Sequence, residues 1–275
     1  MTDPPDDLPR VTVRCYAELV DLAGATEVAV PVGAPRSVKD LVESIGIPHP
    51  EIAQLRVDGV AVDLGHRVVG GERVAVYPPF HALVDPAAPA LAPPWPDPRR
   101  FVLDVHLGTL TRRLRLLGFD CWYRTNAADR DLARVAVAEE RILLTRDRGL
   151  LMRREVVHGY CPRSDDPDLQ AGEVVDRFGL RSRAAPLTRC VGCNGRLRRV
   201  PLEEVAAQVP PRSRAAFDRF ARCDDCHQVF WPGSHVDDLA RFLDRNSTPA
   251  PPTPPGRADS SSRSFPPPED PWPRS

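Results

Sequence analysis

Residues 101–118 have the sequence FVLDVHLGTLTRRLRLLG, in which a short apolar run ends on an aspartate and a helical pattern follows. The helical segment has one apolar stripe and a glycine suited to a C-cap, formed by Leu107, Leu110, Leu114, Leu117 and Gly118. Strand and helix patterns keep alternating after it, with strands expected at 120–124, 141–145 and 156–161 and helices at 129–140, 148–154 and 165–178. This alternation predicts an α/β domain with a parallel sheet, whose strands all have their carboxyl ends at one edge.

Aspartates follow the strands of this expected sheet. Asp104 and Asp147 come at or just after strand ends, and Asp131, in preference to Asp129, begins the helix after the second strand. Carboxylates gathered at one edge repel one another unless a cation neutralises them, and oxygen ligands suit Mg²⁺ or Mn²⁺. The alternative is that each aspartate is only the N-cap of the following helix, for which Asp is a preferred residue.

Four cysteines in two Cys-x-x-Cys pairs follow the expected sheet: Cys190, Cys193, Cys223 and Cys226. This spacing is typical of two knuckles that hold one tetrahedral Zn²⁺. Disulfides are disfavoured because no charged-then-apolar leader begins the sequence. The interval between the pairs is longer than in a compact ribbon, and we expect it to hold a helix at 202–209 that breaks at the PPRS segment, residues 210–213.

Residues 10–80 form a separate N-terminal module. An alternating strand at 11–19, a hairpin partner, a helix that begins after Ser37 and ends at Gly46, and a turn at Asp58-Gly59 predict an α+β fold of the β-grasp class. The segment resembles ubiquitin-like and sulfur-carrier modules. It ends in Tyr77-Pro78-Pro79-Phe80 instead of a free Gly-Gly, so we expect docking or packing and disfavour a sulfur-carrier role. We also expect the rest of the chain to fold and work without residues 1–98.

Composition sets the remaining boundaries. The 32 prolines gather at a few places, and we expect a Pro-rich linker at 81–98 and disorder at 1–9 and in the Pro/Ser-rich tail, 246–275. No apolar run approaches the ~20 residues of a membrane span, so we expect a cytoplasmic protein with no membrane contact. The net charge of -1 combines an acidic N-terminal module with a more basic remainder, which favours an anionic partner for the remainder and a possible protein partner for the module.

The order of these motifs over residues 100–245 resembles the Mut-seven C-terminal RNase domain family, PIN-like nucleases with an appended zinc ribbon and often a β-grasp module in front. The resemblance implies a PIN-like domain at 99–183 and a zinc ribbon at 184–245. Carried over by motif, it implies that Asp104, Asp131 and Asp147 bind the catalytic metal, and that Gly108, Arg112 and Arg115 belong to the family's first helix. A fourth acid is usual in PIN nucleases, and Asp120 and Glu173 are the candidates.

Two functions remain open. The first is a Mg²⁺- or Mn²⁺-dependent endoribonuclease with a structural zinc, in which Arg112, Arg146 and Arg148 contact RNA phosphates. The second is a non-catalytic RNA-binding or adaptor protein that uses the same basic half. Lys39 is the only lysine in the chain, so an excess of arginine reflects the genome as much as any binding site. DNA also remains open as a substrate.

Overall fold

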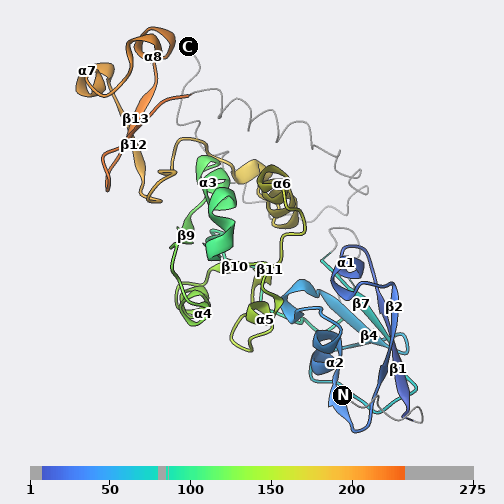
Figure 1. Cartoon of the computed structure of the whole chain (residues 1–275). Coiled ribbons are helices and arrows are strands. Elements are labelled where there is room, and N and C mark those ends of the chain that lie inside the picture. The colour runs from blue at the N-terminus through green and yellow to red at the C-terminus, as the bar shows by residue number, and fades with distance from the viewer. Residues whose placement is uncertain (1–7, 80–84, 86, 233–275) are drawn as a thin grey trace, which may run out of the picture.

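The computed structural model describes residues 8–79, 85 and 87–232. The described part forms three bodies in chain order, with the central body lying between the N-terminal module and the C-terminal ribbon (Figure 1). The expected disorder at 1–9 and 246–275 falls almost wholly outside the described residues. Pro9 is described, and its carbonyl accepts a hydrogen bond from the N–H of Val32 at 2.9 Å. No helix among these residues is both long and apolar enough to cross a bilayer.

The N-terminal module is a five-stranded sheet with one main helix. Its elements are β1 (Arg10–Cys15), α1 (Leu19–Ala23), β2 (Glu27–Pro31), β3 (Arg36–Ser37), α2 (Val38–Ser44), the 3-10 turn η1 (His49–Glu51), β4 (Gln54–Val57), β5 (Val60–Val62), β6 (Arg67–Val68) and β7 (Arg73–Tyr77). The strand order is β2-β1-β7-β4-β5, with β1 and β7 parallel and the other neighbours antiparallel. This is the β-grasp fold expected from the sequence.

Two local features of the module were predicted correctly from the sequence, the N-cap of α2 and the turn between β4 and β5, and the length of the first strand was not. Ser37 is the N-cap of α2, its hydroxyl accepting from the N–H of Asp40 at 3.0 Å, and Asp58-Gly59 turns at positive φ between β4 and β5. The strand expected over residues 11–19 was too long, because β1 ends at Cys15 and the chain enters α1. Leu19 is fully buried from a helix, and burial alone does not distinguish a helix from a strand at that position.

Four parallel strands form the central sheet in the order β11-β10-β8-β9. They are β8 (Phe101–Leu103), β9 (Cys121–Tyr123), β10 (Ile142–Leu144) and β11 (Gly159–Tyr160), and they alternate with η2 (Val105–Leu107), α3 (Gly108–Leu116), α4 (Asp129–Ala138), α5 (Arg148–Leu151), α6 (Pro167–Arg177) and η3 (Arg181–Arg183). The predicted alternation is confirmed. We call the side where the strands end the carboxyl edge (Asp104, Arg124, Thr145, Cys161) and the opposite side the amino edge (Arg100, Asp120, Arg141, His158).

Both faces of the sheet are covered, which is why its strands are apolar without interruption. One face packs against α3 and α6 through Phe101, Leu103, Ile142 and Leu144. The alternate residues Val102 and Leu143 join an apolar cluster with α4 and α5, and this cluster continues into the core of the β-grasp module. The module and the sheet therefore share one core.

The C-terminal body is an antiparallel sheet of three strands in the order β12-β13-β14: β12 (Leu197–Val200), β13 (Phe220–Cys223) and β14 (Val229–Phe230). Between β12 and β13 lie α7 (Leu202–Val205) and α8 (Pro211–Ala216). The helix expected over 202–209 ends early, and the segment expected to break it starts α8 instead. Pro211 is tolerated there because the first turn of a helix does not use its N–H groups.

Candidate functional site

Asp104 and Asp147 both lie at the carboxyl edge and are connected through Thr145. Asp104 is 6% exposed, and its Oδ2 accepts a hydrogen bond from the Thr145 hydroxyl at 2.7 Å. The same Oγ1 accepts from the backbone N–H of Asp147 at 2.9 Å. Thr145 is fully buried at the end of β10, so one hydroxyl fixes the first acid relative to the turn that carries the second. Thr145 was not predicted from the sequence, although it lies only two residues before Asp147.

The helix-cap alternative is realised at Asp147. Its Oδ1 accepts from the N–H groups of Gly149 at 2.8 Å and Leu150 at 3.3 Å, at the start of α5. Its Oδ2 has no hydrogen-bond partner among the described residues. Asp104 is the N-cap of η2, with Oδ1 accepting from Val105 N at 2.5 Å. Capping leaves a carboxylate oxygen of Asp147 available, so it does not exclude cation binding there.

Asp131 is placed differently from these two acids. It lies in the first turn of α4, partly exposed, and Arg134 Nη2 approaches its Oδ1 at 3.0 Å. Within the described ranges, the only group of three or more metal-ligand atoms lying within 4.8 Å of one another belongs to the cysteines. Asp104, Asp131 and Asp147 therefore do not converge as a three-carboxylate site in this arrangement. The oxygens of Asp104 and Asp147 still suit Mg²⁺, which commonly takes one or two protein carboxylates and fills its shell with water and phosphate.

The two candidates for a fourth acid lie at opposite edges. Asp120 is at the amino edge and is bound by Arg141 at 2.7 Å, Arg189 at 3.1 Å and Asn194 Nδ2 at 2.9 Å. Burial alone would raise the pKa of Asp120, but hydrogen bonds from Arg141 and Asn194 outweigh it and lower that pKa. Its position and its cationic partners exclude Asp120 from a site at the carboxyl edge.

Glu173, on α6, is at the correct edge. Its Oε2 accepts from the Tyr160 hydroxyl at 3.1 Å and from Arg163 N at 2.7 Å, and its Oε1 accepts from Ser164 N at 2.9 Å. Glu173 thereby shapes the loop after β11. That loop also carries the exposed Asp165, an acid that follows the fourth strand and that the sequence analysis passed over.

The three arginines expected to bind phosphate have different surroundings. Arg146 pairs with Asp165. Arg148 Nη1 donates to the carbonyl of Leu22 in the β-grasp module at 2.7 Å, so this side chain is committed to an interdomain contact and does not fit the expected role. Arg112 is exposed on α3, and in the described part of the chain no hydrogen bond or ion pair occupies its guanidinium.

The β-grasp module contacts the carboxyl edge through Glu51, which the sequence analysis also missed. Glu51 is fully buried, and its carboxylate accepts from Cys161 N at 2.7 Å, Arg163 Nη1 at 3.0 Å and Arg177 Nη2 at 3.5 Å. Removing one partner of a buried ion pair leaves an uncompensated charge. Nothing in the local sequence around Glu51 distinguishes it from a surface glutamate, because its partners lie more than a hundred residues away.

The four cysteine thiols converge in the ribbon. Cys190 Sγ lies 3.6 Å from Cys226 Sγ and Cys193 Sγ lies 3.4 Å from Cys223 Sγ, with all four sulfurs within 4.8 Å of one another. This cluster is compatible with a zinc ribbon, as expected. Burial raises the pKa of the Cys190 thiol to about 12, so thiolate ligation there requires a cation that displaces the proton.

Gly195 permits this convergence. A Cβ at that position would lie 2.7 Å from Cys223 Sγ and 2.4 Å from Asp225 Oδ2, so the backbone of the first knuckle approaches the second pair only because residue 195 has no side chain. The N–H of Gly195 also approaches Cys193 Sγ at 3.4 Å.

Arg115 fixes the first knuckle to the central domain. It is 5% exposed, and its Nη1 donates to the carbonyls of Gly192 at 2.7 Å and Val191 at 3.2 Å. Its Nη2 donates to Cys121 O at 2.8 Å, at the start of β9. Arg115, which the resemblance assigned to the family's first helix, is therefore a structural contact between that helix, the sheet and the ribbon.

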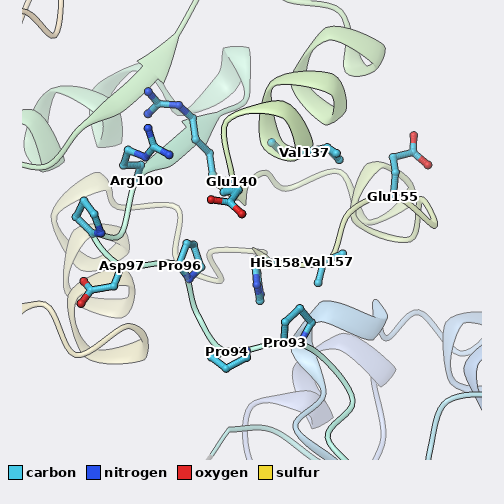
Figure 2. Close-up of a pocket in the computed structure, with 13 residues that line it drawn as sticks. Pro93, Pro94, Pro96, Asp97, Arg100, Val137, Glu140, Glu155, Val157 and His158 are labelled. Carbon is cyan, nitrogen blue, oxygen red and sulfur yellow. The ribbon is translucent and has the colours of Figure 1, made fainter.

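A pocket of about 300 Å³ lies at the amino edge, away from these acids (Figure 2). Linker residues between Pro93 and Pro98 form one wall, and α4 residues including Val137 form another. Trp95 holds the linker in place, with its ring 4.9 Å from that of Phe178 and 5.0 Å from that of His158. The pocket lies at the end of the strands opposite to Asp104. It is formed where the linker packs against the central domain.

Comparison with known proteins agrees with this organisation. A family model described as the Mut7-C RNAse domain matches residues 99–243, and one described as Mut7-C ubiquitin matches residues 8–84. A search of curated proteins found no match. Among solved structures, the chain is similar to the small archaeal modifier protein 1 of H. volcanii (22% identity, TM-score 0.23, 26% of this chain and 99% of that chain). It is also similar to SAMP1 from Haloferax volcanii (22% identity, TM-score 0.23, 26% of this chain and 98% of that chain).

The first family match covers more than half of the chain, over the segment that contains both the parallel sheet and the cysteine cluster. The chain belongs to the Mut7-C RNAse domain family.

Proposed function

We propose that this protein is a ribonuclease that cleaves RNA at the carboxyl edge of the central sheet, with Asp104 and Asp147 as ligands of Mg²⁺ or Mn²⁺. The observation that carries the proposal is the chain of hydrogen bonds from Asp104 through Thr145 to Asp147. A divalent cation held there would stabilise the charge that develops on phosphate and activate water. Asp104 and Asp147 supply oxygen ligands, and Thr145 keeps the first of them in one orientation.

We propose Asp131 as an outer member of this site. It lies in the first turn of α4, and its carboxylate would bind water or phosphate only after its pair with Arg134 opens. Asp165 stands beside Arg146 at the same edge and extends the acidic set. We further propose that cleavage is internal in the RNA strand and takes place in the cytoplasm.

A non-catalytic RNA-binding role is the second candidate. It is favoured by the lack of convergence among the three aspartates. The two candidates differ in what removal of a single carboxylate should do.

Asp147→Asn should lower RNA cleavage by about a hundredfold or more and leave the fold intact. Asn keeps the ability to cap α5 but lacks the charge that holds the cation. RNA affinity should stay constant or rise, because repulsion of phosphate decreases. Asp104→Asn should behave similarly. The measurement compares cleavage of mixed RNAs and DNAs with added Mg²⁺ or Mn²⁺, RNA binding, and thermal melting.

Asp58→Asn is the matched control. Asp58 also accepts a backbone N–H, from Arg73 at 2.9 Å, but in the β4–β5 turn of the other module. The Asp58→Asn substitution also removes one negative charge, and it should leave RNA cleavage unchanged. Unaltered cleavage in both edge variants would mean that Asp104 and Asp147 only cap helices, and the binding role would then replace the proposal.

Thr145→Val should reduce cleavage by roughly 10- to 100-fold, as expected when a group that orients a metal ligand is lost. The valine keeps the shape but removes the hydroxyl that Asp104 and Asp147 share, which should also lower the free energy of unfolding by about 1–3 kcal/mol. Thr145→Ser restores the hydroxyl and should restore most of the activity. Equal activity in the valine and serine variants would contradict an orienting role.

A further inference from the structure

A groove follows α3 from the carboxyl edge to the ribbon. It consists of two pockets, of about 640 and 700 Å³, that share Thr109, Arg112, Val191 and Gly192. The first pocket reaches Val105, which directly follows Asp104. The second ends at Phe230 and Trp231, at the end of β14. We call this continuous surface the α3 groove.

The α3 groove has one sign of charge. Its lining includes four arginines and no aspartate or glutamate, although the whole chain has 38 acidic and 37 basic side chains. Arg113 is paired with Asp168 at 2.6 Å, and Arg115 is buried in the contact with the ribbon. Arg112 and Arg124 are exposed, and neither is paired with a carboxylate in the part of the chain that the structure describes. These two guanidinium groups can bind an anionic ligand without first breaking an ion pair to a carboxylate.

Aromatic rings lie along the same groove. Tyr123 lines the first pocket, and its hydroxyl donates to Val105 O at 2.9 Å, which fixes the ring. Gly108 makes room for this ring, because a Cβ there would lie 2.7 Å from the Tyr123 hydroxyl oxygen. Phe230 and Trp231 stand at the other end of the groove, both partly exposed. Rings at each end with guanidinium groups between them match the stacking and phosphate contacts that bind a single strand.

We propose that the α3 groove binds single-stranded RNA and leads it to the carboxyl edge. Arg112 and Arg124 contact phosphates, and Tyr123, Phe230 and Trp231 stack on unpaired bases. A duplex would bind less well, because its bases are stacked on one another and do not offer their faces to protein rings. The direction of the strand toward Asp104 rests on the proposed ribonuclease function, whereas the binding site itself does not.

The test measures the affinity of the zinc-loaded full chain for a single-stranded oligouridylate of about a dozen nucleotides, a length typical of such sites. Binding is followed across a range of salt concentrations without added Mg²⁺ or Mn²⁺. Arg112→Ala and Arg124→Ala should each weaken binding and reduce the slope of log K against log salt by about 0.7, the value for one lost phosphate contact on a single strand. Arg154→Ala is the matched control, because Arg154 is exposed in the same domain but lies outside the groove.

Trp231→Ala and Trp231→Phe test the stacking contribution. The alanine variant should weaken binding by roughly 5- to 150-fold, as for the loss of one stacked base, with phenylalanine intermediate. Trp231 also packs on the ribbon core, so zinc content and melting are checked in both variants, and the arginine variants remain the decisive measurement. A competing duplex of adenylate and uridylate should bind more weakly than the single strand.

The outcomes separate this inference from the proposed function. Weaker binding in the groove variants supports the α3 groove even if no cleavage occurs in any condition, in which case only the ribonuclease proposal fails. Binding that is unchanged in Arg112→Ala and Arg124→Ala, or lowered no more than in Arg154→Ala, overturns the groove. Tighter binding of the duplex than of the single strand overturns the assignment of single-stranded RNA.

Discussion

Cys223→Ser should unfold the ribbon and abolish the zinc binding that we propose for the four cysteines, the largest effect that we expect from a single substitution. Structural zinc sites contribute roughly 10–16 kcal/mol of apparent binding free energy in small zinc-finger peptides, most of it coupled to folding. The ribbon has a small apolar core of its own, formed by Val200, Val205, Val209 and Phe220. Such a core cannot replace the metal. We therefore expect the wild-type protein to contain one zinc per chain and the variant to contain much less.

Elemental analysis and thermal melting check this expectation. Cys15→Ala is the control, because Cys15 is a buried thiol in the β-grasp core and lies outside the cluster; its zinc content should equal that of the wild type. Loss of the ribbon would also remove the carbonyls of Val191 and Gly192 from Arg115, so RNA affinity should fall together with zinc. A folded ribbon without zinc in freshly reduced protein would refute the metal site.

Glu51→Ala should lower the free energy of unfolding by about 3–5 kcal/mol, the usual cost of breaking a buried ion pair by removing one partner. The largely buried Arg163 would lose its carboxylate, the buried Arg177 would keep only that of Glu18, and the N–H of Cys161 would lose its acceptor. Glu51→Gln keeps an acceptor for that N–H but lacks the charge, so its stability should be intermediate. Thermal and urea unfolding of the full chain measure the relative stabilities of the wild type, Glu51→Gln and Glu51→Ala.

Activity provides a second measurement for Glu51. The loop after β11 is held from one side by Glu51 and from the other by Glu173, through Arg163. We expect both variants to lower kcat for RNA cleavage more than they change KM, because the loop borders the acids and not the α3 groove. Glu18→Gln, which removes the charge of a partly exposed partner of Arg177, should change stability by less than about 1 kcal/mol. Equal stability of Glu51→Ala and Glu18→Gln would contradict a special role for Glu51.

The interface around Glu51 also argues against the expectation that residues 1–98 are dispensable. Their removal would expose Val156 and the α4 and α5 side chains that share the β-grasp core. It would also leave Arg148 without the carbonyl of Leu22 and His158 without the ring of Trp95. The difference in charge between the two halves and the proline-rich linker suggested separable modules. Neither feature shows that the β-grasp module and the central sheet pack against each other.

The sequence predicted the elements that depend on local periodicity and capping. The alternation of strands and helices after Phe101, the N-cap at Ser37 and the two cysteine pairs all depend on near neighbours in the chain, and each is present. The sequence also predicted that Asp104 and Asp147 lie at one edge of the sheet, because parallel strands all end on the same side. The side-chain partners of the aspartates and arginines were not predicted, since Thr145, Leu22 and Asp165 become their neighbours only through the tertiary fold.

Two errors have a common physical origin. Leu19 was assigned to a strand because apolar and polar residues keep alternating as far as that position, and Asp120 was a candidate for the fourth acid although it lies at the start of its strand. Both assignments used the chemical nature of a residue without its direction in space. Asp120 lies on the amino side of its strand, and that single fact decides its role.

The distance along the chain between Glu51 and its partner Cys161 is 110 residues. At a synthesis rate of roughly 5–20 residues per second, the ribosome needs about 6–22 s to produce the second half of this contact after the first. During that interval the β-grasp module emerges with a hydrated glutamate on the face that will later be dry. Arg163 and Arg177 follow the last strand of the sheet, so the carboxylate of Glu51 stays hydrated until its cationic partners have been made and becomes buried only when the two parts of the chain meet.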